Sequence, residues 1–138
     1  MIFFSACQNS NKEKITLNDF PQKKFKKVIT YEMSGEDGHI IENEKLSKDL
    51  IITEKRLSEK EANTLLDILL DDATYGDVAA KCFEPRLGYV FYSENNEVAA
   101  HATVCLACNQ IRTSPDIGVF ILSERGKKRL RELKETVE

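Results

Sequence analysis

A capped amphipathic helix is the strongest local signal in this sequence, and it constrains how the segments around it can fold. Ser58 is followed three residues later by Glu61, which is the pattern of a capping box at a helix start. Apolar side chains then recur on one helical face, at Ala62, Leu65, Leu66, Leu69 and Leu70. The sequence therefore predicts a helix over residues 58–70 whose single apolar stripe packs against a core.

Short β-branched and aromatic segments lie on both sides of this helix. They are bounded by glycine, asparagine, serine or proline, which favour turns. We predict strands over residues 28–33, 39–42, 50–53, 87–92 and 98–104, with 109–113 continuing the last one and 118–122 forming a final short strand or the approach to a helix. Because neighbouring short strands are separated by turns, antiparallel pairing is favoured.

A second amphipathic helix is expected to follow Ser123. Leu130, Leu133 and Val137 recur at spacings of three and four residues, and basic side chains occupy the other face. Together these elements predict an α+β fold, in which an antiparallel sheet of short strands and hairpins carries two amphipathic helices on one face. We place this single domain at residues 28–138.

Composition excludes several classes of protein. A chain of 138 residues is long enough for one ordinary domain, and 41% apolar with 31% charged residues is a globular balance. The net charge of −3 lacks the basic excess of nucleic-acid binders, so we expect no nucleic-acid partner. A glycine-rich phosphate loop is also missing from the sequence.

The first 27 residues differ in composition from the rest. Residues 2–6 are apolar and small, and the stretch from residue 8 to residue 27 is polar and rich in lysine. The apolar run is far shorter than the roughly 20 residues that span a bilayer. We therefore interpret residues 1–27 as a signal remnant and a flexible Lys-rich tether.

This start resembles the lipobox of bacterial lipoproteins, in which a bulky apolar residue and two small residues precede a lipidated cysteine. Phe4, Ser5, Ala6 and Cys7 match that pattern, although leucine is usual where Phe4 stands. The apolar run is also shorter than the roughly 7–15 residues of a secretory signal. The resemblance implies a lipid on Cys7, the membrane as a partner through that lipid, and a lipid-anchored, extracytoplasmic place in the bacterial cell envelope.

The remaining cysteines are Cys82, Cys105 and Cys108. The predicted hairpin over residues 87–104 begins near Cys82 and ends at Cys105. Since a hairpin returns its end close to its beginning, we expect the three thiols to meet. A disulfide from Cys82 to either Cys105 or Cys108 would close a loop of about 25 residues and stabilise the fold by roughly 3 kcal/mol, and an envelope location permits it.

Two other uses of these cysteines stay open. The first is a zinc site with three thiolates and a fourth ligand, for which His39, Glu84 and Asp77 are candidates. His101 is not a candidate alongside Cys105, because four residues of strand span about 13 Å. The second is a redox pair that cycles between dithiol and disulfide, although residues 109–115 do not predict the helix that follows such a pair in thioredoxin-like proteins.

The segment around these cysteines also resembles a family of small, uncharacterised bacterial proteins. Its members share C-x2-P followed by a basic residue, a hairpin, and then C-bulky-x-C, and residues 82–86 and 104–108 match this arrangement. The resemblance covers residues 57–135 and implies no activity. Many members carry a histidine where Leu87 stands, so a property that depends on that histidine is not expected.

The sequence thus favours a non-enzymatic lipoprotein of the cell envelope, a binding or structural module with a disulfide between Cys82 and the Cys105/Cys108 pair and with no cofactor. The alternatives are a zinc-binding module that uses Cys82, Cys105 and Cys108, and a thiol redox protein.

Overall fold

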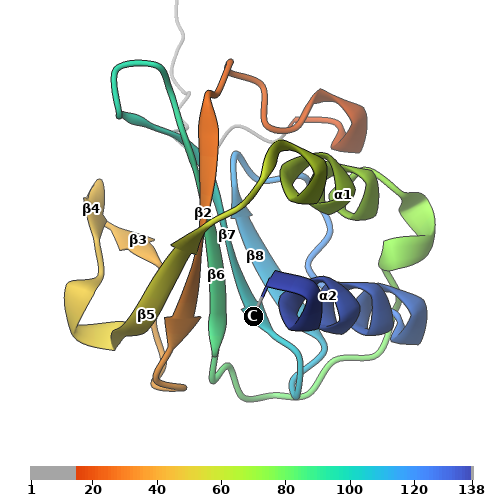
Figure 1. Ribbon diagram of the computed structural model, residues 1–138. Coiled ribbons are helices and arrows are strands. Elements are labelled where there is room, and N and C mark those ends of the chain that lie inside the picture. Colours follow the sequence, from red (N-terminus) through yellow and green to blue (C-terminus); the bar gives the residue numbers. More distant parts are fainter. Residues whose placement is uncertain (1–14, 138) are drawn as a thin grey trace, which may run out of the picture.

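A five-stranded antiparallel sheet forms the centre of the computed structural model, which describes residues 15–137 (Figure 1). Every neighbouring pair of its strands is antiparallel. In spatial order the strands are β5 (Ile51–Arg56), β2 (Lys27–Met33), β6 (Leu87–Tyr92), β7 (Val98–Cys105) and β8 (Gln110–Ser114). The predicted α+β class with an antiparallel sheet is confirmed.

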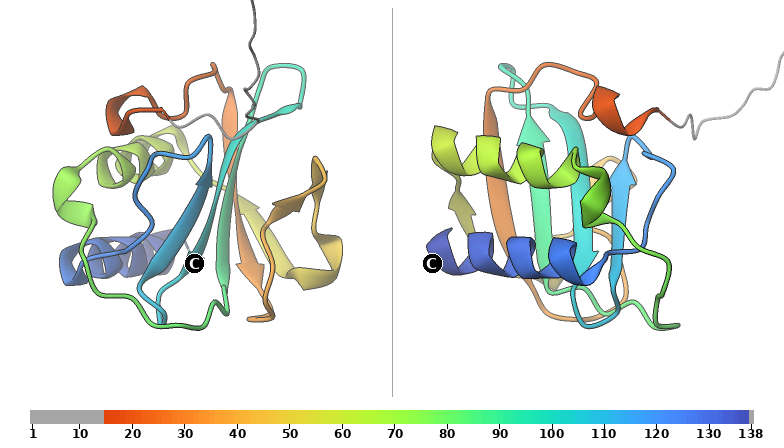
Figure 2. Two further views of the ribbon diagram at one scale, coloured as in Figure 1. Left: turned by 180° about the vertical axis from the view of Figure 1, so that it is seen from behind. Right: turned by 90° about the vertical axis from the view of Figure 1, so that its right-hand side faces the viewer.

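Two helices, α1 (Glu59–Leu69) and α2 (Glu124–Val137), lie side by side on one face of this sheet (Figure 2). The predicted capping box is present at the start of α1. The Glu61 N–H donates to Ser58 Oγ at 3.1 Å, and the Ser58 N–H donates to Glu61 Oε1 at 2.8 Å. Both backbone donors would otherwise lack partners in the first turn of the helix.

The main hydrophobic core fills the space between the helices and the sheet. Alternate side chains of each strand point to this layer, as the two-residue period of a strand requires. Its fully buried members include Val28, Leu65, Ile68, Phe91, Val104, Ile111 and Leu130.

The opposite face of the sheet is covered by a small hairpin of β3 (Ile41–Glu42) and β4 (Lys45–Leu46) and by the short 3-10 helix Lys48–Leu50. Asn43 and Glu44 have φ of 54° and 65°, the values of a tight two-residue turn. The predicted strand at 39–42 therefore pairs with β4 and does not join the main sheet, and β5 lies beside β2 at the edge of that sheet.

Ile40 fixes this cover onto the sheet. Its N–H donates to Thr103 Oγ1 at 2.8 Å, and its side chain lies over Gly88, where an added Cβ would come within 3.0 Å. The central strands are consequently buried on both faces, which explains why β6 is almost continuously apolar instead of alternating.

Ordered structure extends to the N-terminal side of residue 28, the predicted domain boundary. The 3-10 helix Leu17–Asp19 leads into Phe20, which is 3% exposed and packs edge-on against Phe91 at 5.5 Å between ring centroids. Phe25 makes a similar contact with Phe91 at 5.2 Å. Cys7 lies outside the described residues. Among those residues, the helices are all too short or too polar to cross a membrane.

The loop after α1 joins this helix to α2 at a close contact. The 3-10 helix Asp72–Thr74 packs against the first turn of α2, where the Ser123 N–H donates to Thr74 O at 2.9 Å. Gly126 of α2 faces Thr74 so closely that an added Cβ would overlap the Thr74 carbonyl oxygen and lie 2.9 Å from its Cγ2. A glycine is thus required in the first turn of this helix for packing.

We expect Gly126→Ala to lower the free energy of unfolding by about 1–3 kcal/mol, because the added methyl group overpacks the contact with Thr74. At a solvent-exposed helix position the same change would raise the free energy of unfolding by up to about 1 kcal/mol. The sign of the measured change therefore shows whether the close contact is present. Urea denaturation measures it, with Lys128→Ala on the exposed face of α2 as a near-neutral control. A stabilised G126A protein would contradict the close contact.

Candidate functional site

Cys82, Cys105 and Cys108 lie together at one end of the sheet, the lower end in Figure 1. The pairing of Leu87 with Val104 brings the loop before β6 next to the end of β7. Cys105 and Cys108 form a disulfide with 5.2 Å between their Cα atoms, and the Sγ of Cys82 lies 3.1 Å from the Sγ of Cys108. The predicted meeting of the three cysteines is confirmed.

The pairing differs from the bridge that the sequence favoured. Cys82 is a free thiol, and the two cysteines of the CxxC segment are bonded to each other. The reason is a tight turn after β7, in which the Asn109 N–H donates to Leu106 O and the Cys108 N–H donates to Cys105 Sγ at 3.2 Å. Asn109 has a φ of 58°, which asparagine tolerates better than most residues.

The disulfide is buried and the third thiol is exposed. Cys105 is 1% exposed and Cys108 is fully buried, whereas Cys82 is accessible to solvent. The ring of Phe83 packs on the disulfide, and the Arg112 guanidinium lies 3.9 Å from the centre of that ring. Solvent therefore reaches this group of sulfur atoms through Cys82.

Gln110 holds the loop that carries Cys82. Its side-chain amide nitrogen donates to Ala80 O at 2.7 Å and to Cys82 O at 2.9 Å, and the Ala80 N–H donates to Cys108 O at 3.1 Å. These three bonds fix the backbone of the loop against the CxxC turn. The sequence contains no signal for this role, because a glutamine next to a turn is ordinarily a solvated residue.

The predicted fourth zinc ligands do not join the cysteines. The ring of His39 lies at a tilt to that of Phe83, with 6.0 Å between ring centroids, and Glu84 and Asp77 are exposed. Within residues 15–137, groups of three or more His, Cys, Asp and Glu side chains placed to hold a metal ion are not found. The zinc site stays a prediction from the sequence.

His101 is the most perturbed histidine of the protein. It lies on β7 between Val90 and Ser114, and its Nδ1 atom is buried without a hydrogen-bond partner. Burial, and to a lesser extent the nearby charge of His39, lowers the pKa of His101 from 6.5 to about 4. The imidazole is therefore neutral around pH 7.

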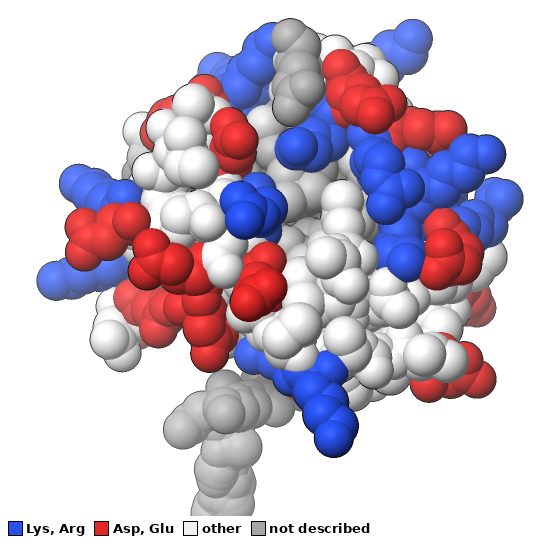
Figure 3. Space-filling model, turned by 90° about the horizontal axis from the view of Figure 1, so that it is seen from below, with Lys and Arg blue, Asp and Glu red and all other residues white. Residues whose placement is uncertain are grey.

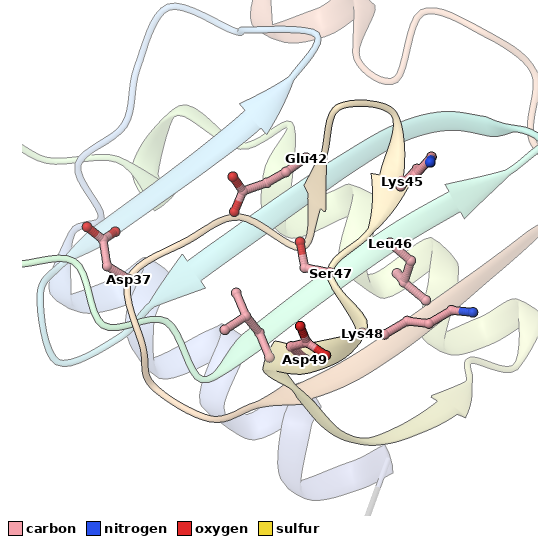
Figure 4. A pocket seen from close by; sticks show the side chains of 8 residues that line it. Asp37, Glu42, Lys45, Leu46, Ser47, Lys48 and Asp49 are labelled. Carbon is pink, nitrogen blue, oxygen red and sulfur yellow. The ribbon is translucent and has the colours of Figure 1, made fainter.

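A hollow lies next to the β3–β4 hairpin (Figure 4). It has a volume of about 780 Å³ and is open to solvent. The carboxylates of Asp37 and Glu42 lie on one side of it, and the ammonium groups of Lys45 and Lys48 lie on the other. Glu42 is already engaged, because its carboxylate accepts the His39 N–H at 3.0 Å. We assign no chemistry to this hollow.

Charge is unevenly distributed around the cysteine end of the molecule (Figure 3). Acidic side chains predominate on the side of β3, β4 and β5, and basic side chains predominate on the side of α2. A largely uncharged area separates them.

Comparison with known proteins gives no further assignment: no family model, curated protein or solved structure matches the chain. The resemblances of residues 4–7 to a lipobox and of residues 57–135 to small bacterial proteins stay predictions.

We expect acid to destabilise the protein through His101. The unfolded chain binds the proton near pH 6.5 and the folded chain only near pH 4, so the free energy of unfolding falls as pH is lowered across this window. This difference in proton binding corresponds to about 3 kcal/mol of unfolding free energy between pH 7 and pH 4. Urea denaturation at both pH values should show this extra loss in the unmodified protein but not in His101→Gln.

His39→Gln is the matched control, and it should keep most of the loss, because burial is the larger cause of the shift. Parallel stability–pH curves for the unmodified protein and H101Q would contradict the assignment.

Proposed function

We propose that this protein is a thiol–disulfide exchange module of the bacterial cell envelope, held at the membrane by a lipid on Cys7. The observation that carries the proposal is the 3.1 Å separation between the Sγ of Cys82 and the Sγ of Cys108, which places a free thiol against a disulfide. Disulfides form by attack of a thiolate on a disulfide sulfur, so this contact is the starting arrangement for exchange. Of the uses that the sequence left open, the redox one has the best geometric support.

The exchange consists of three steps. Cys82 first loses its proton to water, and its thiolate attacks Cys108 Sγ; a Cys82–Cys108 disulfide forms, and Cys105 leaves as a thiolate that takes up a proton. A thiolate from a partner dithiol then attacks Cys82 Sγ, which displaces the Cys108 thiolate and joins the partner to Cys82. The partner's second thiolate then attacks the partner sulfur that is bonded to Cys82, and Cys82 leaves as a thiolate that takes up a proton. The partner is thereby oxidised to a disulfide, and all three cysteines end as thiols.

Because Cys105 and Cys108 are buried, Cys82 is the cysteine that a partner can reach. A partner in solvent cannot approach Cys105 or Cys108 directly, since both are covered by Phe83 and by the loop that Gln110 holds. Cys82 is exposed and adjacent to Cys108, so it connects the buried disulfide with the outside. Gln110 is a positioning residue, because it acts only through the Cys82 backbone.

A second candidate function has its own supporting observation. Two buried, covered cysteines are also what a purely structural disulfide requires, and such a bond resists reduction. In that case the protein is the non-enzymatic envelope module that the sequence favoured, and Cys82 takes no part in exchange. Exchange kinetics separate the two functions.

We expect Cys82→Ser to slow reduction of the Cys105–Cys108 disulfide by a small thiol by about tenfold or more, because the exposed route is lost. Rapid alkylation followed by mass analysis measures the rate, and peptide mapping of the untreated protein should find both Cys105–Cys108 and Cys82–Cys108 bonds. Cys7→Ser is the matched cysteine control and should leave the rate unchanged. Equal rates for C82S and the unmodified protein would support the structural function instead.

The lipid anchor has a separate test. We expect the protein, expressed in bacteria from its gene with the natural upstream sequence, to incorporate a labelled fatty acid and to partition into detergent. Cys7→Ser should abolish the label, and Cys82→Ser should keep it, because the resemblance to a lipobox places lipid on Cys7 alone. Labelling of both variants would show that the lipid is elsewhere, and labelling of neither would refute the anchor.

A further inference from the structure

Exposed apolar side chains gather at the cysteine end of the molecule. Among residues 15–137, four large apolar side chains stand out as exposed: Val78 at 70%, Ile52 at 56%, Phe120 at 53% and Val119 at 39%. Ile52 lies on the outer strand β5. The other three belong to the two segments that border the CxxC turn.

Hydrogen bonds place these two segments on either side of Asn109 and Gln110. Val78 O accepts the Asn109 side-chain amide at 3.1 Å, and two residues later Ala80 is bonded to Cys108 and Gln110. On the other side, Phe120 O accepts the Ile111 N–H at 2.8 Å, and Ile121 pairs with Gln110. The two segments are also bonded to each other, through the Gly76 N–H and Ile121 O.

These contacts place a group of exposed apolar side chains around the CxxC turn. We call Val78, Ala79, Ala80, Val119 and Phe120 the apolar rim of Cys82; all five are exposed. Both segments of the rim are bonded to residues 108–111, and hydrogen-bonded neighbouring segments lie about 4.8 Å apart. The rim therefore lies close to Gln110, whose side chain is bonded to the Cys82 backbone. Figure 3, which views this end, shows the uncharged area between the acidic and basic sides.

We infer that the partner in the exchange is an extended polypeptide whose cysteine is flanked by apolar side chains. This inference rests on the proposed exchange function and names its substrate class. A mixed disulfide with Cys82 fixes the position of the partner's sulfur, so the residues beside it must lie against the apolar rim. Apolar residues there remove the rim from water, which is favourable, and polar residues or a small hydrophilic thiol do not.

The conformation of the partner follows from where cysteines are found in proteins. Cysteine and large apolar residues are among those most often buried in folded domains. A chain that presents a cysteine together with apolar neighbours is therefore an unfolded or incompletely folded one. The bonds that form and break are those of the second exchange step: the peptide thiolate attacks Cys82 Sγ, and Cys108 leaves as a thiolate that takes up a proton.

Two short peptides test the substrate class. Both carry one cysteine and the same net charge; leucine and phenylalanine flank the cysteine in the first, and serine and glycine in the second. We expect the full chain, oxidised and carrying Cys7→Ser, to form the mixed disulfide with the apolar peptide about tenfold faster than with the polar one. Val78→Ser combined with Phe120→Ser should reduce this preference to about one by slowing the reaction with the apolar peptide.

Ile52→Ser is the matched control, because it removes an equally exposed apolar side chain from a strand away from Cys82. A full preference in I52S and none in the V78S/F120S variant supports the inference. Equal rates for the two peptides with the parent protein, or an unchanged preference in V78S/F120S, would overturn the inference and leave the exchange function standing. A parent protein that reacts with neither peptide would overturn the exchange function as well.

Discussion

The register between β6 and β7 is the constraint on which the rest of this structure depends. Pairing of Leu87 with Val104 joins the loop before one strand to the turn after the next; Cys82 and Cys108 lie in those two connections, and Cys105 is the last residue of β7. The same strands supply Phe91 and Val104 to the core beneath the helices and Val90 to the core beneath the β3–β4 hairpin. A shift by one residue would exchange the two faces and separate the cysteines.

Burial on both faces of the central strands is what holds this register. Helices cover one face, and Ile40, locked to Thr103 and Gly88, anchors the cover of the other. The lower end of the sheet is closed less completely, by a loop without regular structure that Gln110 and Asn109 bind through side-chain amides. The molecule thus combines a rigid support with an accessible thiol, which is the arrangement that exchange chemistry needs: a fixed disulfide and a reachable nucleophile.

Much of the fold could be predicted from local patterns. The capping box at Ser58, the apolar period of both helices and the strands at 87–92 and 98–104 all depend on interactions between residues close in the sequence. The β3–β4 hairpin was missed, because residues 39–42 have the composition of a strand for the main sheet and only the turn at Asn43 directs them elsewhere. The packing of Phe20 was hidden in a lysine-rich stretch, where two aromatic side chains are a weak signal.

The sequence by itself determined that Cys82, Cys105 and Cys108 would be neighbours, since a hairpin must return to its starting point. Only the tertiary structure decided which two are bonded, because that depends on the turn at Asn109 and on the amide of Gln110, and neither leaves a periodic pattern. The tertiary structure also decided which cysteines solvent can reach. Phe83 and Arg112 cover the Cys105–Cys108 disulfide, and the Cys82 thiol stays exposed near the apolar rim. Solvent access is a property of the packed chain, and a cysteine acquires it only from the residues that fold over it.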